Sequence, residues 1–443
     1  MEKKEASIVL ESGKCRWGKC YFCGWGRKEV KKDLEHLKKK LLNFLEKNKG
    51  IKRLKIFSSG SCLDKEQFER EFLEWVGKVV EKYKIEELVI ESRPEFIKKE
   101  NLEPLLGRKF TLIVAIGLEA GDDKILKMIN KGFRVRDYVK ACKLLHSLKC
   151  KVRTYLLVNC CKELFENRKL QKKVLKQSFE LVEKYSDEVV IINTYPHYNS
   201  ELWKDYISLK WKPLDEGQFY SLVKPYLRKK GIKVEIDFNN FNYVPRFPGW
   251  ARKRLKGVGK EFLTHPYYEV WQDFFVRFYK PPKGKFPLFL PCSYKKPYPK
   301  SKTWRTILQA LKEIGALDKL HLIAISSPGV IPREFVNYYP FNSYDWEEWR
   351  ETEEIKKLYV KVTYRRIKNY LKAHAKNYRK PFFAYFRLES ESLIALKKAC
   401  QDLNLRLISI VKKKDYELVK DYKPALASGY LIEKLKEKLS EKI

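Results

Sequence analysis

The sequence lacks any long apolar run. Nothing in its 443 residues approaches the roughly 20 consecutive apolar residues that a membrane-spanning helix needs. The start of the chain is charged and no signal-type apolar segment follows it. These absences predict a cytoplasmic protein with no membrane partner.

Acidic residues are also scarce relative to basic ones. Asp and Glu total 56 against 94 Lys and Arg, for a net charge of +38. A charge this large exceeds what solubility alone favours, and phosphates neutralised by Lys or Arg release their condensed counterions. A lysine-rich thermophile surface is the alternative, but its ion-pair networks need both signs of charge. The balance therefore predicts a nucleic acid partner.

Apolar residues are nevertheless sufficient for a folded protein. Hydrophobic residues make up 44% and aromatic residues 14% of the chain, which argues against a disordered or fibrous protein. The length predicts two or three domains. Ten cysteines in an intracellular chain indicate metal or redox chemistry rather than disulfides.

The first half of the sequence alternates short aliphatic runs with amphipathic segments. Repeated right-handed βα units form a parallel sheet that curls into a full or partial barrel, with its chemistry in the loops at the carboxyl ends of the strands. The expected strands are 6–10, 54–57, 87–90, 111–116, 152–158 and 189–192, and the expected helices are 30–48, 66–84, 136–148 and 169–185.

A second α/β alternation begins at residue 286. Between the two regions lies a segment rich in aromatic, proline and basic residues. We expect a barrel domain at 1–237, a basic aromatic linker or bridging segment at 238–285, a smaller α/β domain at 286–425 and a basic C-terminal helix at 426–443. The expected strands of the smaller domain are 287–290, 322–326, 382–386 and 405–410, and its helices are 303–314, 349–374 and 390–402.

Three cysteines follow the first expected strand directly. Cys15, Cys20 and Cys23 have the spacing Cys-x4-Cys-x2-Cys. Three thiolates on one short loop can hold three irons of a 4Fe-4S cluster and leave the fourth iron open. A zinc knuckle is the alternative, but it normally needs four ligands, and the nearest further candidates are His36 and Cys62. The position of the loop in a βα array favours the iron–sulfur cluster.

The cysteine loop and four further strings resemble the archaeal radical S-adenosylmethionine (SAM) enzymes of archaeosine formation. The strings are SGSCLD at 59–64, ESRPEF at 91–96, GLE at 117–119 and INKGF at 129–133. The resemblance covers residues 5–230 and implies a partial (βα) radical SAM barrel whose cofactors are a 4Fe-4S cluster and SAM. The sequence departs from the family in its cysteine spacing, at Cys62 and at the NCC string of 159–161.

The resemblance also implies roles for polar residues at the carboxyl ends of the strands. Charged and hydroxyl side chains at this end of a barrel are placed for chemistry, although strand-to-helix turns and surface salt bridges are the simpler explanations. We expect Ser59, Gly60, Ser61, Arg93 and Glu119 to bind SAM, and Glu91 and Lys131 to bind the substrate.

The second domain carries the string PCSYKKPYPKS at 291–301, followed by SSPGVIPRE at 326–334. These strings resemble the core domain of archaeosine synthases, which add lysine to the nitrile of the preQ0 base in tRNA. The resemblance implies catalytic roles for Cys292, Lys296 and Ser301 and a substrate-binding role for Tyr298. A thiolate at Cys292 could capture the nitrile as a thioimidate, whereas a buried structural thiol is the alternative. A histidine is usual where this chain has Trp304.

The two resemblances concern consecutive steps on one substrate. Together they imply a tRNA-modifying lyase that cleaves the lysine carbon–nitrogen bond of lysinyl-preQ0 to give archaeosine, with a C-terminal domain that adds the lysine or binds the adduct. The implied partners are tRNA carrying preQ0 or its lysinyl adduct, free lysine, an electron donor and a separate archaeosine synthase subunit. The alternatives are another radical SAM modification of tRNA, such as methylthiolation, and a zinc-stabilised RNA-binding module. The stretch 243–256 is expected to grip RNA or to bridge the domains.

Overall fold

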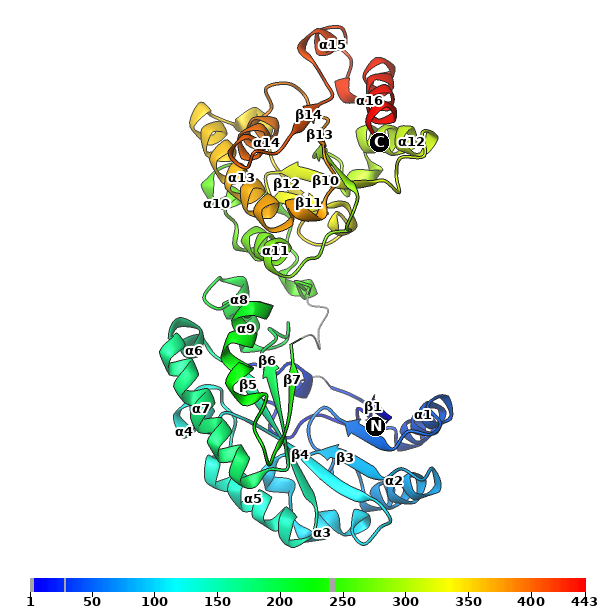
Figure 1. Cartoon of the computed structure of the whole chain (residues 1–443), viewed down its shortest axis with the longest axis vertical. Helices are drawn as coiled ribbons and strands as arrows, with labels where there is room; N and C mark the ends of the chain where they lie inside the picture. Colours follow the sequence, from blue (N-terminus) through cyan, green and yellow to red (C-terminus); the bar gives the residue numbers. More distant parts are fainter. Residues whose placement is uncertain (1–3, 28, 239–243) are drawn as a thin grey trace. The chain divides into compact units, whose positions relative to one another are not determined.

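The chain folds into two compact units, Met1–Tyr243 and Val244–Ile443, each with its own sheet (Figure 1). The computed structural model describes residues 4–27, 29–238 and 244–443. Over these residues, none of the helices combines the length and the apolar character that crossing a bilayer requires.

The N-terminal unit is a partial barrel of seven parallel strands, and it confirms the predicted fold class. The strands pair in chain order, each with the next, as repeated βα units require. The seventh strand is absent from the sequence prediction because it is short, carries charge at alternate positions and is only partly buried. The strands are β1 (Glu5–Val9), β2 (Arg53–Phe57), β3 (Glu87–Glu91), β4 (Thr111–Glu119), β5 (Lys151–Val158), β6 (Glu188–Asn193) and β7 (Lys233–Asp237).

Helices cover the outer face of this sheet (Figure 1). Strand side chains alternate between the two faces, so Leu54 and Ile56 of β2 and Leu88 and Ile90 of β3 belong to the large core under the helices. The main covering helices are α1 (Leu34–Lys47), α2 (Arg70–Lys82), α5 (Val135–Ser147) and α7 (Arg168–Tyr185).

The inner face of the barrel carries a buried network of charged side chains near the starts of the strands. Arg53 of β2 donates to Glu188 of β6 at 2.5 and 2.8 Å, although these two strands are not neighbours in the sheet. Arg153 of β5 donates to Glu188 at 2.5 Å and to Glu235 of β7. Burial opposes ionisation, but the two guanidinium groups hold the pKa of Glu188 below its ordinary value. The network therefore links opposite sides of the curved sheet.

The C-terminal unit is an α/β domain whose main sheet is mixed and has the strand order β11, β10, β9, β13, β14. Strand β11 is antiparallel to β10, whereas the other pairs are parallel. The strands are β9 (Phe286–Pro291), β10 (Leu320–Ser326), β11 (Gly329–Pro332), β13 (Phe382–Ala384) and β14 (Leu407–Ser409). The main helices of this unit include α12 (Lys302–Glu313), α13 (Glu353–His374), α14 (Glu391–Asp402) and α16 (Gly429–Lys442).

The structure differs from the sequence expectation for the segment 238–285. From Val244 onward this segment is part of the C-terminal unit rather than a connection between units. Helix α11 (Pro266–Arg277) buries Trp271 and Phe275, and Trp271 donates its indole N–H to the carbonyl of Tyr339 at 3.0 Å. The short strand β8 (Leu255–Lys256) pairs with β12 (Tyr344–Asp345). The segment is rich in aromatic residues because several of them, such as Trp271 and Phe275, fill the core of the C-terminal unit. Residues 239–243 lie outside the described residues.

We predict that Glu188→Gln destabilises the barrel by about 3 kcal/mol, because it removes the carboxylate that two buried guanidinium groups share and leaves Arg53 only its pairs with Glu87 and Glu5 and Arg153 only its pair with Glu235. Native-state hydrogen exchange of the β5 and β6 amides measures this change. Glu180→Gln is the matched control, since its 3.8 Å ion pair with Lys176 is exposed and should contribute little. Equal protection in the two variants would contradict the prediction.

Candidate functional site

The three predicted cluster cysteines lie together on the loop that connects β1 to α1, and all three are free thiols. The loop is fastened to the turn that follows α4 (Asp123–Met128). Trp17 donates its indole N–H to the carbonyl of Asn130 at 2.8 Å, and the Asn130 side chain donates to the carbonyl of Lys19 at 3.0 Å. The amide of Tyr21 donates to the carbonyl of Ile129 at 2.9 Å. The part of the loop from Trp17 to Tyr21 is therefore held by this turn.

Glycines allow this close packing. A Cβ at Gly132, whose φ is +81°, would lie 2.4 Å from the Trp17 ring. A Cβ at Gly60 would lie 2.9 Å from Cys15 Cα, and one at Gly26 would lie 2.8 Å from Cys15 Cβ. The predicted SAM-binding residue Gly60 is thus brought directly against the cysteine loop.

The donor set suits an iron–sulfur cluster. Burial raises the pKa of the Cys20 thiol, and the nearby cations Lys131 and Arg93 oppose this by favouring the thiolate. Among the described residues, no three His, Cys, Asp or Glu side chains come close enough together to hold a single metal ion. In a 4Fe-4S cluster each thiolate binds a different iron, so its ligands need not converge in that way.

Ser59 and Ser61 lie after β2, beside this loop. The Ser61 amide donates to the Gln67 side chain at 2.8 Å, and Gln67 in turn donates to the carbonyl of Lys14 at 2.9 Å. The Ser61 hydroxyl bonds that of Ser92 at 2.7 Å. The Ser59 hydroxyl is buried and has no hydrogen-bond partner among the described residues. An unsatisfied buried hydroxyl next to the cluster loop fits a site for a polar cofactor.

Glu119 and Lys131, which the sequence assigns to different ligands, form one buried ion pair. Lys131 Nζ lies 2.7 Å from Glu119 Oε1, and both residues are 7% exposed. Although burial favours the neutral amine, the Glu119 carboxylate holds the pKa of Lys131 above its usual value. The ammonium also lies 5.7 Å from the centre of the Phe22 ring, within the cysteine loop. The pair therefore places a fixed dipole beside Cys20.

Arg93 has several protein partners. Its guanidinium donates to Glu95 at 2.5 Å and to the carbonyl of Lys131 at 3.0 Å, and it lies over the Trp17 ring at 5.5 Å.

Glu91 accepts from the backbone N–H of Ser58, and burial raises the pKa of its carboxyl group to about 7. A carboxyl group with this pKa can accept or release a proton near neutral pH.

The remaining cysteines of the barrel pack in its core. The Cys62 thiol points to the carbonyl of Ile56 at 3.8 Å, and burial raises its pKa to about 12. The adjacent thiols of Cys160 and Cys161 are buried, and a hydrogen bond between them raises the pKa of Cys160. His36 is exposed on α1.

The C-terminal unit has a cavity of about 820 Å³ at the carboxyl ends of three neighbouring strands. Cys292 follows β9, Ser326 ends β10 and Arg387 follows β13, and all three line the cavity. In parallel α/β sheets, ligands bind at this edge. The predicted catalytic residues Cys292, Lys296 and Ser301 therefore line the same cavity. The sequence alone did not predict this cavity.

Two of these residues have shifted acidities. Burial raises the pKa of the Cys292 thiol, Glu348 adds to the shift and Lys296 opposes it. Burial lowers the pKa of Lys296, whose ammonium lies 4.1 Å from the centre of the Tyr344 ring. A thiol and a weakly basic amine thus lie in the same cavity, which suits proton transfer between them.

Tyr298 and Ser301 have structural contacts that the sequence did not indicate. Tyr298 is fully buried under the cavity and bonds the Tyr344 hydroxyl at 2.5 Å, so it does not line the cavity. Ser301 caps α12 by accepting from the amide of Trp304 at 3.2 Å. Trp304 is fully buried and donates its indole N–H to the carbonyl of Pro291 at 2.9 Å. Trp304 thus supports the loop that carries Cys292. Its indole cannot act as an acid or a base, as the histidine that is usual at this position could.

Comparison with known proteins bears on both units. A sequence model of the radical SAM superfamily matches residues 12–169, and one of a domain of unknown function, DUF5591, matches residues 269–416. The first match confirms the predicted superfamily of the barrel, whose cofactors are a 4Fe-4S cluster and SAM.

Several curated relatives are subunits of archaeosine synthase. The chain is 28% identical over 207 residues to archaeosine synthase subunit beta of Methanosarcina acetivorans, which is 43% of this chain and 58% of that protein. It is 32% identical to the beta subunit of Thermococcus kodakarensis over 38% of this chain and 54% of that protein. It is 28% identical to the alpha subunit from the same organism over 34% of this chain and 28% of that protein. The chain thus spans about half the length of these beta subunits.

Sequence reasoning missed the residues that build the site without touching a ligand. Gln67 links the Ser59–Ser61 turn to the cysteine loop, and Asn130 bonds that loop from the other side. Gly117 leaves room for the buried ion pair because it has no side chain. Asn130 and Gly117 stood within the strings that carried the resemblance, which was the available signal. Gln67 had none, because its partners are 6 and 53 residues away.

We predict that Gly117→Ala destabilises the barrel by about 1–3 kcal/mol through overpacking. The new Cβ would lie 2.5 Å from Glu119 Oε1 and 3.2 Å from Lys131 Nζ and would displace the buried pair. Hydrogen exchange of the β4 amides measures the loss. Gly217→Ala in α9 (Glu216–Val223) is the control, because its Cβ meets only Asp215 Oδ1 at 3.6 Å. A Gly117→Ala variant as stable as this control would refute the prediction.

Proposed function

We propose that this chain, which joins a radical SAM domain to a DUF5591 domain, forms archaeosine in tRNA by cleaving the lysine carbon–nitrogen bond of the lysinyl-preQ0 intermediate. The observation that carries this proposal is the combination of the two domains in one chain whose relatives include both alpha and beta subunits of archaeosine synthase. The net charge of +38 supports a tRNA substrate.

The barrel interior supports the radical step. When bound, a cluster and SAM would supply the radical chemistry that abstracts a hydrogen atom from the lysine moiety. Cys15, Cys20 and Cys23 would hold the cluster, and the orphaned Ser59 hydroxyl would bond SAM. The Glu119–Lys131 pair would orient the charged ends of SAM and substrate.

Glu91 would act as the proton acceptor of this site. Its carboxyl group lies at the carboxyl end of β3, close enough to Lys131 and Glu119 for their charges to act on it. With a pKa of about 7 it can take a proton from the lysine nitrogen or return one to the product amidine.

The C-terminal cavity would add lysine to the nitrile or bind the resulting adduct. In the first case the Cys292 thiol adds across the carbon–nitrogen triple bond, Lys296 accepts the thiol proton and passes it to the nitrile nitrogen, and the lysine amine then displaces the thiol. The lowered pKa of Lys296 supports this role. We also propose a separate synthase subunit as a partner, since the relatives are named as alpha and beta subunits, and an electron donor, since reductive cleavage of SAM consumes an electron.

The test is an anaerobic reaction with SAM, a reductant, lysine and preQ0-tRNA or its lysinyl adduct, followed by nucleoside mass spectrometry. Archaeosine and 5′-deoxyadenosine should form in equal amounts from the adduct. Cys23→Ala should abolish both products by loss of the cluster. Cys62→Ala, which removes a packed thiol at the same end of the barrel, should keep its iron and its activity.

Two outcomes would count against this proposal. One is a lysinyl adduct that never converts to archaeosine while SAM is cleaved. The other is a methylthiolated nucleoside, which would indicate a different radical modification. Unchanged lysine addition by Cys292→Ala would refute the thioimidate step alone.

A further inference from the structure

The mouth of the C-terminal cavity has an uncompensated positive charge. Lys295, Lys300, Arg305 and Lys423 line the cavity, and no carboxylate within the described parts of the chain pairs with any of them. The lysines of α16 contrast with these, because Lys434 and Lys438 each bond a glutamate three residues away. The mouth therefore differs from the charge-balanced surface of the neighbouring helix.

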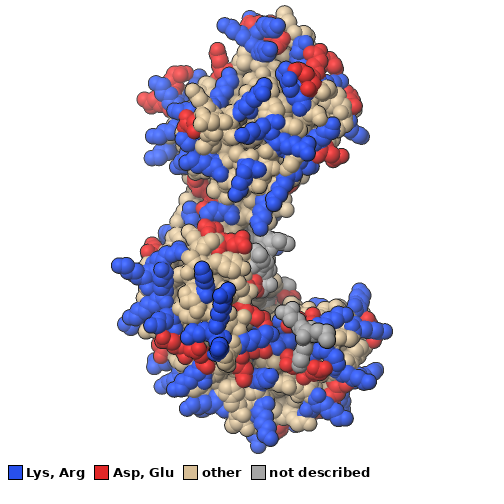
Figure 2. Space-filling view, in the orientation of Figure 1, with Lys and Arg blue, Asp and Glu red and all other residues tan. Residues whose placement is uncertain are grey.

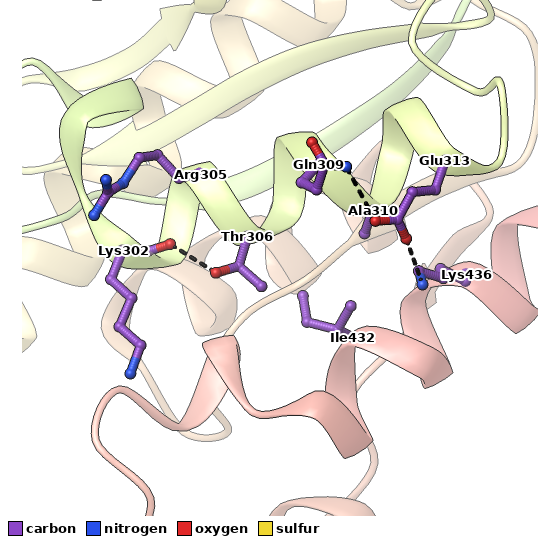
Figure 3. Close-up of a pocket in the computed structure, with 8 residues that line it drawn as sticks. All are labelled: Lys302, Arg305, Thr306, Gln309, Ala310, Glu313, Ile432 and Lys436. Atoms are coloured by element: carbon purple, nitrogen blue, oxygen red, sulfur yellow. Dashed lines mark hydrogen bonds and ion pairs between the residues drawn. The ribbon is translucent and has the colours of Figure 1, made fainter.

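The basic edge continues beyond the cavity along α12. A second hollow of about 410 Å³ lies between α12 and α16, and Lys302 and Arg305 line both spaces. Figure 3 shows these two side chains at one end of this hollow and the Glu313–Lys436 ion pair at the other. A chain of phosphates could therefore follow α12 and reach the cavity mouth over Lys302 and Arg305.

Aromatic side chains stand exposed at the same mouth. Tyr294 is 73%, Trp349 70% and Tyr422 44% exposed, and all three line the cavity. Lys302 donates to the Tyr422 hydroxyl at 3.2 Å and lies 4.9 Å from the centre of its ring. Exposed rings beside unpaired cations are the combination with which proteins bind unpaired nucleotides, since bases stack on the rings and phosphates contact the cations.

The acidic residues of the cavity lining indicate which way round a nucleotide would lie. They are Glu348, Glu351 and Glu391, from the segment before α13 and the first turn of α14. Trp346 donates to Glu351 at 2.5 Å, and Arg387 lies 3.5 Å from Glu348. Phosphates would be repelled from this part, so they belong at the α12 edge, with the base pointing inward. Figure 2 shows both basic and acidic side chains on the visible faces of both units.

We infer that the C-terminal cavity takes a nucleotide extruded from RNA, base first, with its flanking phosphates on Lys302 and Arg305 and its base stacked at Tyr294 and Tyr422. The volume of about 820 Å³ lies within the range of roughly 300–1,000 Å³ of small-ligand sites, so a nucleotide fits. An enzyme that modifies a base must bring it out of its stack to reach it. This inference rests on the proposed function for the choice of tRNA as the RNA.

The first test compares two double variants of the full chain that remove the same charge. Lys302→Ala/Arg305→Ala should weaken tRNA binding at least tenfold in fluorescence anisotropy and lower the salt slope of log Kd by about 2. Lys434→Ala/Lys438→Ala on α16 should change neither by more than about twofold, because those cations already have glutamate partners. Equal losses in the two variants would overturn the inference.

The second test locates the base. A tRNA with 6-thioguanosine at the position of the modified base should, on irradiation of its complex with the anaerobically purified protein, crosslink to peptides containing Tyr294 or Tyr422. Tyr294→Leu should reduce this crosslink severalfold and Tyr294→Phe should not, because stacking needs the ring. Crosslinks confined to other peptides would overturn the inference.

The two proposals can fail separately. Crosslinking at the cavity without archaeosine or a lysinyl adduct would refute the proposed function and leave the nucleotide site standing. Formation of archaeosine or a lysinyl adduct, with crosslinks only outside the cavity, would refute the nucleotide site and leave the proposed function standing.

Discussion

The buried charge network of the barrel is the interaction on which the rest of the N-terminal unit depends. Arg53 and Glu188 lie on β2 and β6, which are separated by three strands in the sheet, yet they bond at 2.5 Å. Only a curved sheet brings them together, and a buried charge without its partner would cost several kcal/mol. The curvature in turn makes the carboxyl ends of the strands converge, so that loops far apart in sequence surround one space.

The cysteine loop is positioned by residues from other parts of the chain. The turn at Asn130 and Gly132 and the Ser59–Ser61 turn both press against it. Glu119 and Lys131 complete the space with a buried ion pair. Their charges neutralise each other, so the site can hold a charged cofactor without an isolated charge of its own. The C-terminal cavity follows the same principle at a smaller sheet, because its reactive groups also lie at the carboxyl ends of parallel strands.

Much of the fold could be predicted because hydrophobic periodicity is a local property. Six strands of the barrel, four of the second sheet and the main helices follow from it. The misses have local reasons too. Strand β7 is only partly buried, β11 has four residues, and the aromatic residues of α11 resembled a linker because they fill a core on several sides. Tyr298 was assigned to substrate from its string, whereas its neighbours Tyr344 and Trp304 enclose it in the interior.

By itself, the sequence determined the order of βα units, the three thiols on one loop and the excess of basic charge. Each of these is written in adjacent residues or in composition. Only the tertiary structure decided which polar groups face one another. It paired Glu119 with Lys131 and gathered Cys292 and Lys296 into one cavity, and over the described residues it left Lys295, Lys300, Arg305 and Lys423 at the mouth of that cavity without a carboxylate partner. Such pairings depend on distances across a curved sheet or between helices, and no local pattern encodes those distances.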